Sequence, residues 1–186
     1  MAGTIVLVVI VGALLWAVLA YNRLVTLRNR VQNGWKQIDV QLKRRHDLIP
    51  NLVETVKGAM QFERETLERV MQARARAVGA TGVRESAAAE SEVSHTLGRL
   101  FAVMENYPAL KSNENVLQLQ EELTTTENQL AFARQFYNDM VMQFNTSQQV
   151  FPASLVANFF AFTPAEFFRA ADEERGVPRV DLSLQK

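Results

Sequence analysis

The sequence predicts an all-α fold: an antiparallel helical bundle of the four-helix type with a long kinked first helix, carried on an N-terminal transmembrane helix. Three observations support this prediction. The 186 residues include only 8 Gly and 5 Pro, which disfavours a turn-rich β fold. Residues 2–22 carry no charged side chain. Beyond them, apolar residues recur at the three- and four-residue spacing typical of helices.

The composition excludes several classes of function. The 20 Lys and Arg balance the 20 Asp and Glu, so we expect no nucleic-acid partner. The chain has no Cys and only 2 His, which leaves little for thiol or histidine chemistry. It contains no glycine-rich phosphate loop, nucleophile elbow or His-Glu-x-x-His pattern. We therefore expect no catalytic residue, no cofactor and no metal, and a protein that is not an enzyme.

Residues 1–22 are predicted to be a transmembrane anchor. As a helix, the uncharged segment is about 31 Å long, close to the thickness of the hydrocarbon layer. Its apolar core begins at Ile5, and Trp16 and Tyr21 lie near its end, where Tyr21 suits the interfacial aromatic belt. The alternative, a cleaved signal peptide, lacks the expected basic N-terminal region. Residues 23–50 then carry seven basic side chains against two acidic ones, which predicts an outside N-terminus and a cytoplasmic bundle.

The bundle domain is predicted to span residues 23–172, followed by a flexible tail over 173–186. Its first helix is expected to run over residues 22–78 as one kinked helix, because no reversal signal accompanies Pro50. A helical hairpin at Pro50 is the open alternative. The glycines at 79 and 82 end this element.

Three further helices are expected. The second runs from about residue 85 to 106, and the third over 116–148 after a cap at Ser112 or Asn113. The third has a coiled-coil-like apolar series over four heptads. It ends at Phe151-Pro152, and Thr163-Pro164 predicts the start of a short fourth helix that ends near residue 172.

Three segments, 44–58, 105–115 and 133–138, resemble motifs of the bacterial LemA family, and the N-terminal span followed by Tyr21-Asn22-Arg23-Leu24 is also similar. The resemblance implies a helical bundle on one membrane helix in the inner (cytoplasmic) membrane of a bacterium. It implies no defined biochemical activity, although such proteins are associated with genes for membrane proteostasis, including a membrane metalloprotease. The motif residues to which a structural role is assigned are Arg45, Asp47, Pro50, Asn51, Asn106, Tyr107, Arg134, Tyr137 and Asn138.

The run of ionisable residues at 44–47, just before Pro50, has two interpretations. It forms a binding notch for an anionic group, or it forms an internal network that satisfies the backbone carbonyl freed by the proline. The second is favoured, with Asp47 and Asn51 as expected members. The third helix offers Arg134, Asn138 and Asp139 as partners. Asp47→Ala is then expected to cost about 1–3 kcal/mol of stability. A Glu-x-x-His pair at 92–95 has di-iron spacing but is interpreted as a coincidence on a helix surface.

A phenylalanine-rich segment near the C-terminus is a possible interaction face. The favoured interpretation is a hydrophobic plug over the end of the bundle, and the alternatives are insertion into the membrane surface or a docking face. The residues assigned to this face are Phe159, Phe160, Phe162, Phe167 and Phe168.

The predicted function is that of a single-pass, membrane-anchored scaffold or adaptor that acts through protein–protein contacts. The alternative is a regulatory subunit or substrate adaptor of a membrane protease or signalling complex. The expected partners are the lipid bilayer and further copies of the chain. Under the alternative, the partner is a membrane protease or another membrane protein. The homo-oligomer is inferred from helix lengths, because a first helix over 22–78 is too long for its partners to cover its apolar stripe near Leu24, Val31 and Trp35.

Overall fold

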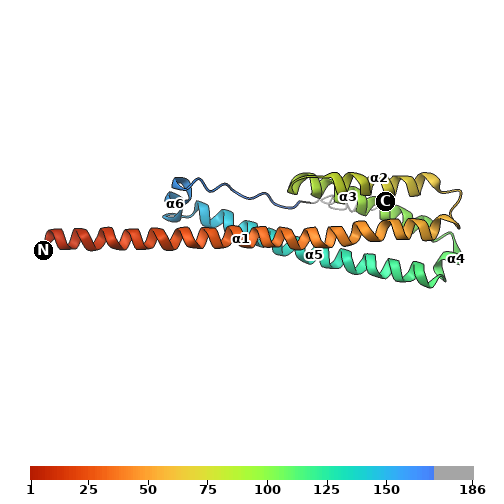
Figure 1. Cartoon of the computed structure of the whole chain (residues 1–186), viewed down its shortest axis with the longest axis horizontal. Helices are drawn as coiled ribbons and strands as arrows, with labels where there is room; N and C mark the ends of the chain where they lie inside the picture. The colour runs from red at the N-terminus through yellow and green to blue at the C-terminus, as the bar shows by residue number, and fades with distance from the viewer. Residues whose placement is uncertain (170–186) are drawn as a thin grey trace, which may run out of the picture.

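The computed structural model describes residues 1–169, which form helices and no strand. This confirms the predicted all-α class (Figure 1). The predicted tail over 173–186 lies outside the described residues. The helices are α1 (Ala2–Lys57), α2 (Arg64–Gly79), α3 (Val83–Met104), α4 (Pro108–Lys111), α5 (Glu114–Gln149) and α6 (Ala153–Phe159).

The molecule is an elongated bundle built on α1 (Figure 1). α5 lies antiparallel to α1, and α2 and α3 form a hairpin against the half of α1 farther from the N-terminus. We call the end with the α1–α2 turn and α4 the distal end. At the opposite, proximal end, α6 packs on α1, and the chain then runs back along the bundle in extended form.

The prediction of one helix over 22–78 is wrong, because α1 ends at Lys57 and the chain reverses through residues 58–63. Pro50 stays inside α1, so the hairpin at Pro50 is also wrong. The reversal buries Met60 completely and turns the apolar face of α2 towards the bundle. A continuous helix over 22–78 would leave the apolar face of α2 in water. The free energy gained by burying this face therefore outweighs the helical propensity of residues 58–63.

Three apolar clusters follow one another along the rod. The distal cluster lies among α1, α2, α3 and the start of α5, the middle cluster between α1 and α5, and the proximal cluster between α1 and α6. The middle cluster includes Leu27 and Val31, and the proximal cluster includes Leu24. The stripe that was predicted to lack a partner is therefore buried within one chain, and the helix-length argument for a homo-oligomer is wrong in its premise.

The third predicted helix is confirmed as α5. Asn113 caps it, since its Oδ1 accepts hydrogen bonds from the backbone N–H groups of Asn115 (3.0 Å) and Val116 (3.2 Å). α5 approaches α1 closely at Gly34, where an added Cβ would lie 3.2 Å from the Cα of Tyr137. Phe151-Pro152 follows the end of α5, as predicted.

The predicted fourth helix beginning at Thr163 is wrong over its described part, because residues 162–169 are extended. The short helix α6 lies earlier, at Ala153–Phe159. Thr163-Pro164 is a good local start signal, but the backbone that follows it is engaged by side chains of α5, as described below.

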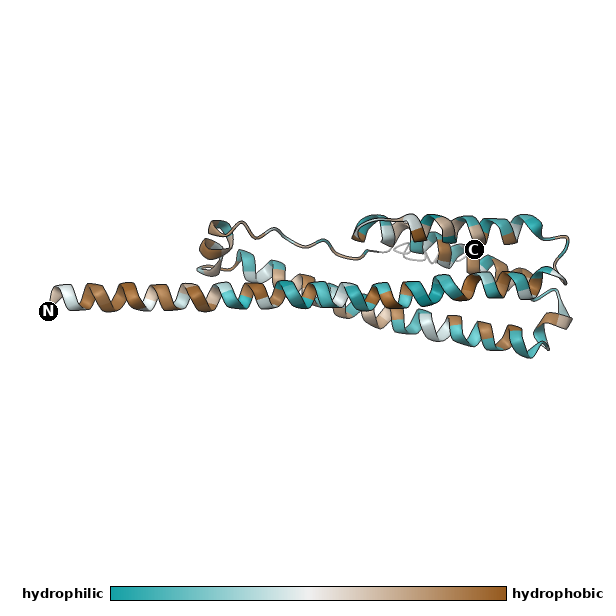
Figure 2. Ribbon diagram, viewed as in Figure 1, coloured by the Kyte–Doolittle hydropathy of each residue, from teal (hydrophilic) through white to brown (hydrophobic). Residues whose placement is uncertain are grey.

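The N-terminal part of α1 is apolar and long enough to cross a bilayer, and none of its most apolar 18-residue window is buried by the described residues (Figure 2). Ile5 is 65% exposed and Trp16 is 39% exposed. A protein in water would not leave so many large apolar side chains open, so the segment is a candidate membrane span.

Candidate functional site

A layer of charged side chains crosses the bundle between the distal and middle clusters. Arg45 on α1 is 4% exposed and Glu90 on α3 is 1% exposed. Nη1 of Arg45 donates to Oε2 of Glu90 over 3.0 Å, and Nη2 donates to Oγ of Ser94 over 2.9 Å. The second carboxylate oxygen of Glu90 lies 2.6 Å from Nε2 of His46. One glutamate of α3 therefore holds two adjacent side chains of α1.

The layer extends to α5 through Glu127. Its Oε2 forms an ion pair with Nη2 of Arg45 at 2.7 Å, and its Oε1 lies 3.7 Å from Nη1 of Arg134. Charges buried this deeply are tolerated only when they are paired and hydrogen-bonded. The layer therefore sets the register among α1, α3 and α5, and the carboxylates that face Arg45 come from the chain itself. The geometry fits a structural network better than a binding notch.

Pro50 has no N–H, so the carbonyl of His46 lacks its usual helical donor. The structure supplies a replacement from another helix, because Nε of Arg74 on α2 donates to that oxygen over 2.6 Å. The predicted members Asp47 and Asn51 are not part of this network, since both are exposed. Arg45 and His46 occupy the inward face of α1, and a helical step of about 100° per residue turns Asp47 outward.

The other motif residues of α5 hold the extended chain that follows α6. Tyr137 is buried and its hydroxyl donates to the carbonyl of Glu166 over 2.8 Å. The side-chain amide of Asn138 bonds both backbone groups of Phe168, at 2.9 and 3.0 Å. Asn145 does the same to Ala165, at 2.8 and 2.9 Å.

We call the hydrogen bonds of Asn138 and Asn145 the clamp. The distance between the two asparagines along α5 matches the distance between the two residues that they bind. Seven residues of helix between Asn138 and Asn145 rise about 10.5 Å, and three extended residues between Ala165 and Phe168 cover about 10 Å. Each side-chain amide bonds both the N–H and the C=O of one extended residue, as a neighbouring β-strand would. This competing set of hydrogen bonds explains why Thr163-Pro164 does not start a helix.

The clamp also changes the chemistry of Tyr137. Burial raises the pKa of its phenol above the ordinary value, and the nearby carboxylate of Glu166 raises it further. The neutral phenol can donate to the Glu166 carbonyl, whereas the phenolate cannot. Arg134, the remaining motif residue of this helix, stacks its guanidinium 5.0 Å from the ring centre of Phe168.

The motif at 105–115 lies at the distal end, far from the charged layer. Asn106 is exposed, while Tyr107 is half-buried and its hydroxyl donates to Oε1 of Glu63 over 3.4 Å. Burial raises the pKa of Tyr107, with a further contribution from Glu63. This contact joins the α3–α4 turn to the α1–α2 turn, so the motif closes the end of the bundle.

The phenylalanine-rich segment divides into two parts. Phe168 is buried in the middle cluster, and Phe162 and Phe167 are half-buried against it. Phe159 and Phe160 remain exposed, although the Phe160 ring contacts Tyr21 with centroids 4.6 Å apart. Phe167 and Phe168 therefore pack along the middle of the rod and not over its end as a plug, and the outer residues are left open.

An exposed apolar groove runs between α1 and α5 halfway along the rod. Val40, Phe132 and Phe136 are exposed in it, and Phe132 keeps 73% of its side-chain surface open. Its remaining lining consists of Lys36, Gln37, Gln41, Gln129 and Ala133. The chain as described does not fill this groove.

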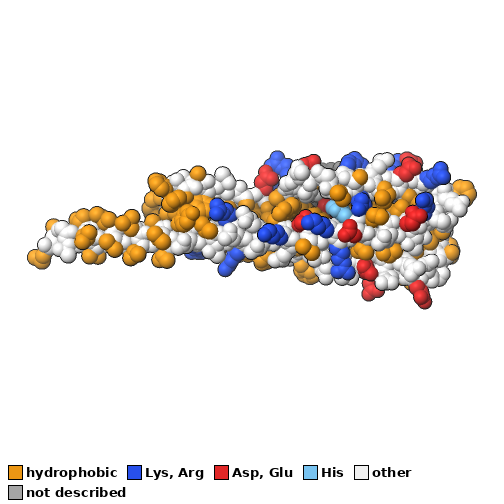
Figure 3. Space-filling model, in the orientation of Figure 1, with side chains coloured by type: hydrophobic (Ala, Val, Ile, Leu, Met, Phe, Trp, Pro, Cys, Tyr) orange, Lys and Arg blue, Asp and Glu red, His pale blue; other side chains and the backbone are white. Residues whose placement is uncertain are grey.

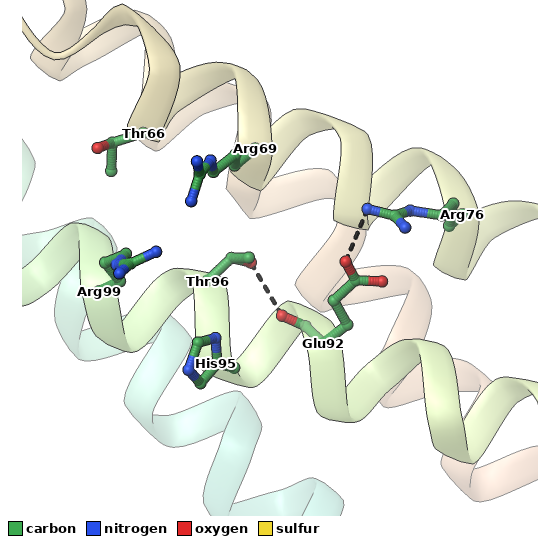
Figure 4. A pocket seen from close by; sticks show the side chains of 7 residues that line it. All are labelled: Thr66, Arg69, Arg76, Glu92, His95, Thr96 and Arg99. Atoms are coloured by element: carbon green, nitrogen blue, oxygen red, sulfur yellow. Dashed lines mark hydrogen bonds and ion pairs between the residues drawn. The ribbon is translucent and has the colours of Figure 1, made fainter.

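A basic cavity of about 310 Å³ opens between α2 and α3 (Figure 4). Arg69 and Arg99 reach into it from the two helices, and Arg76 forms an ion pair with Glu92 at 2.6 Å. His95 lines the same cavity, but the Glu92 carboxylate is directed at Arg76 and not at His95 (Figure 4). Within residues 1–169, no three His, Cys, Asp or Glu side chains are grouped as metal ligands.

The motif positions were predicted from sequence, whereas Glu90, Arg74, Glu127 and Asn145 were missed as site residues. Glu90 is the one acidic residue in the apolar stripe of α3, and that position is a usable signal. The others carry no local signal, because their roles depend on which helix faces them.

These features define a class: a membrane-associated helical bundle with a buried charged layer, an exposed apolar groove and a clamped C-terminal segment. A family model of known proteins matches residues 34–182, and the chain belongs to the LemA family. It is 27% identical to Protein LemA of Metamycoplasma hominis over 156 residues, which cover 83% of this chain and 71% of that protein.

Magnetosome proteins are also similar to the chain. Magnetosome protein MamQ 2 of Paramagnetospirillum magneticum is 23% identical over 175 residues, and Magnetosome protein MamQ of Magnetospirillum gryphiswaldense is 23% identical over 174. Each match covers 80% of this chain but only 64% of the relative. The family and these relatives carry non-enzymatic names and are bacterial.

Proposed function

We propose that the chain is a single-pass scaffold or adaptor of the inner bacterial membrane, with its bundle in the cytoplasm, and that it acts through protein–protein contacts rather than catalysis. The observation that carries the proposal is the continuity of α1, which joins a lipid-length apolar segment to a rod with an open apolar groove. A rigid helix transmits the height and direction of the anchor to the groove. Any partner that binds the groove is thereby held at a fixed distance from the bilayer.

The groove fits a second copy of the chain as its occupant. All anchored copies stand at the same height and point the same way, so identical grooves face one another across a two-fold axis normal to the membrane. The lining has no carboxylate, and its glutamines can pair across such an axis. In the described chain, Oε1 of Gln41 is buried in the groove wall with no hydrogen-bond donor, which a partner amide would supply.

Three exposed apolar side chains form a small contact, well below the size of a stable soluble interface. The membrane anchor offsets this weakness, because confinement to one plane raises the effective concentration. We therefore expect association in membranes and dissociation on dilution in detergent.

Crosslinking in membranes tests the proposal. Because the chain has no Cys, each introduced Cys is the only thiol that can react. Phe132→Cys should form a disulfide-linked dimer in native membranes under mild oxidation, and Phe62→Cys at the distal turn should not. Adding Phe136→Glu to Phe132→Cys should abolish the dimer without unfolding the chain, because Phe136 lies partly in solvent. A photocrosslinker at position 132 that captures a membrane protease or another membrane protein instead would replace the scaffold with the adaptor or regulatory-subunit alternative. No adduct of either kind would overturn the role of the groove.

Orientation has a separate test. Phe62→Cys should react with a membrane-impermeant maleimide only after the inner membrane of intact spheroplasts is opened. Labelling without lysis would place the bundle outside the cytoplasm.

A further inference from the structure

The proximal end of the bundle carries a cluster of exposed apolar side chains around α6. We define the proximal patch as Val150, Phe151, Leu155, Phe159 and Phe160. Phe151 and Phe159 are 76% and 81% exposed, although an aromatic side chain typically buries about 150–250 Å² in a core or an interface. Figure 3 shows apolar side chains gathered over α6 and the N-terminal helix, with charged side chains over the rest of the rod.

The position of the patch along α1 limits what can cover it. The inner side of α6, through Val156 and Ala157, packs in the same cluster as Ala17, Ala20 and Tyr21. If residues 2–22 span a hydrocarbon layer of about 30 Å, these residues of α1 lie at its edge. α6 is fixed to the same level by this packing. Its outer side therefore lies at the boundary between acyl chains and headgroups.

The sequence around the patch is depleted of charge in the same way as the span. Residues 140–165 contain no Asp, Glu, Lys or Arg, and on α1 the same holds for residues 2–22. The first charged residue after the span is Arg23, whereas Asp139 and Glu166 flank the second segment. Arg23 borders a shallow cavity with Val150 and Ala153, and the Arg28 guanidinium lies 5.5 Å from the ring centre of Phe162. Apolar side chains at acyl depth with arginines just above them match the layered chemistry of an anionic bilayer surface.

We propose that the proximal patch is a second membrane contact, in which α6 and its two flanking turns insert into the lipid interface beside the span. The occupant of the patch is the bilayer itself, including phospholipids whose phosphates approach Arg23 and Arg28. The span alone leaves the rod free to tilt and rotate about one helix. Insertion of α6 on one side of that helix restricts both motions, and so fixes the direction in which the α1–α5 groove faces. The proposal rests on membrane anchorage of α1, but not on the dimer.

Lipid-depth quenching of single-cysteine variants tests this contact. The full-length variants Leu155→Cys and Phe159→Cys are labelled with an environment-sensitive fluorophore and reconstituted in vesicles of phosphatidylethanolamine and phosphatidylglycerol. Leu19→Cys is the reference within the span, and Phe62→Cys is the matched exposed control at the distal end, where the side chain is 95% exposed. Circular dichroism confirms that each variant retains its helix content.

We expect labels at 155 and 159 to be quenched by nitroxide on lipid acyl chains to the same degree as the label at 19, and to lose their quenching by aqueous iodide. The label at 62 should behave in the opposite way. Iodide quenching at 155 and 159 equal to that at 62 would overturn the contact, while flotation of the same vesicles with bound protein would show that anchorage still holds. Loss of flotation together with iodide access at 19 would instead overturn the anchorage.

A protein covering the patch gives a third, distinct result. Labels at 155 and 159 would then be protected from both lipid nitroxide and iodide. If that protection disappeared at low protein-to-lipid ratio, a second copy would be the occupant, and the membrane contact would be wrong.

Discussion

Glu90 joins α3 to two side chains of α1, because its two carboxylate oxygens hold Arg45 and His46 separately. Almost no water reaches the site, so the attraction between these groups is weakly screened and the loss of either partner is costly. These internal ion pairs compensate the charges that lie inside the bundle.

Replacing Glu90 with Gln should destabilise the fold by about 3 kcal/mol, because the buried Arg45 then loses one of its two carboxylates. Urea unfolding of the protein in mild detergent, followed by circular dichroism, measures the change. Asp47→Asn is the matched control on the exposed neighbour and should change stability by less than about 0.5 kcal/mol. Equal effects of the two substitutions would contradict the assignment of the network.

Tyr137 gives the fold a dependence on alkaline pH. Its pKa is higher in the folded chain than the ordinary value of 10.0, first because it is buried and then because of Glu166. Above about pH 10 the unfolded chain therefore loses this proton more readily than the folded chain does, and the free energy of unfolding falls as pH rises. Below pH 10 this residue contributes no pH dependence.

Tyr137→Phe should reduce the slope of stability against pH above pH 10. Tyr107 has a raised pKa as well, so some slope should remain until Tyr107→Phe is added. Unfolding free energies measured between pH 8 and 11 test the sign. A slope unchanged by both substitutions would show that other groups cause it.

At the scale of elements, α1 continues through Pro50 because α2 supplies the missing hydrogen bond. Arg74→Met should leave the His46 carbonyl without its donor and cost about 2 kcal/mol. In a Pro50→Ala background the residue at 50 has an N–H again, so the same substitution should cost clearly less. A double-mutant cycle measures the difference. Additive effects would mean that Arg74 stabilises the bundle by another route.

The extended segment after α6 depends on two amides of α5. Asn145→Ala removes both hydrogen bonds to Ala165 and should weaken the docking of residues 162–168 by about 2 kcal/mol. Hydrogen exchange of the Ala165 and Phe168 amides should then accelerate, with no change in the distal cluster. Asn106→Ala, at the exposed distal end, is the control. Slow exchange at Phe168 in the Asn145 variant would show that Asn138 holds the segment alone.

Local signals predicted some elements and could not predict others. The cap at Asn113 and the stop at Phe151-Pro152 are read from adjacent residues, and both agree with the structure. The turn at 58–63 has only Gly58 as a local signal, and the backbone of that glycine stays in the αR region. Its main cause is the burial of Met60 against helices distant in sequence. The partners of Arg45 depend on the same long-range packing. Sequence periodicity predicts which face of a helix is buried, but not which residues of another helix meet it.

At the scale of the whole molecule, a straight α1 sets the distance between the membrane and the distal end of the bundle. From Asn22 to Lys57 the helix rises about 50 Å, so an upright rod holds its distal turn far above the headgroups. A rod lying on the surface would bring the basic cavity between α2 and α3 to the lipid instead. The two arrangements place opposite ends of the molecule against the membrane.

Energy transfer from a dye on Phe62→Cys to acceptors on lipid headgroups separates these arrangements. An upright rod should give a donor height of about 50 Å, with little change when salt is raised, because apolar contacts and not surface charges hold it. Replacing Leu155 and Phe159 with Ser should lower the mean height and broaden its distribution, since the span alone does not resist tilting. The matched pair Val40→Ser and Phe132→Ser removes apolar surface from the groove and should leave the height unchanged. If the dye at position 62 lies near the bilayer surface when the patch residues are unchanged, the rod lies flat and the groove lies close to the lipid.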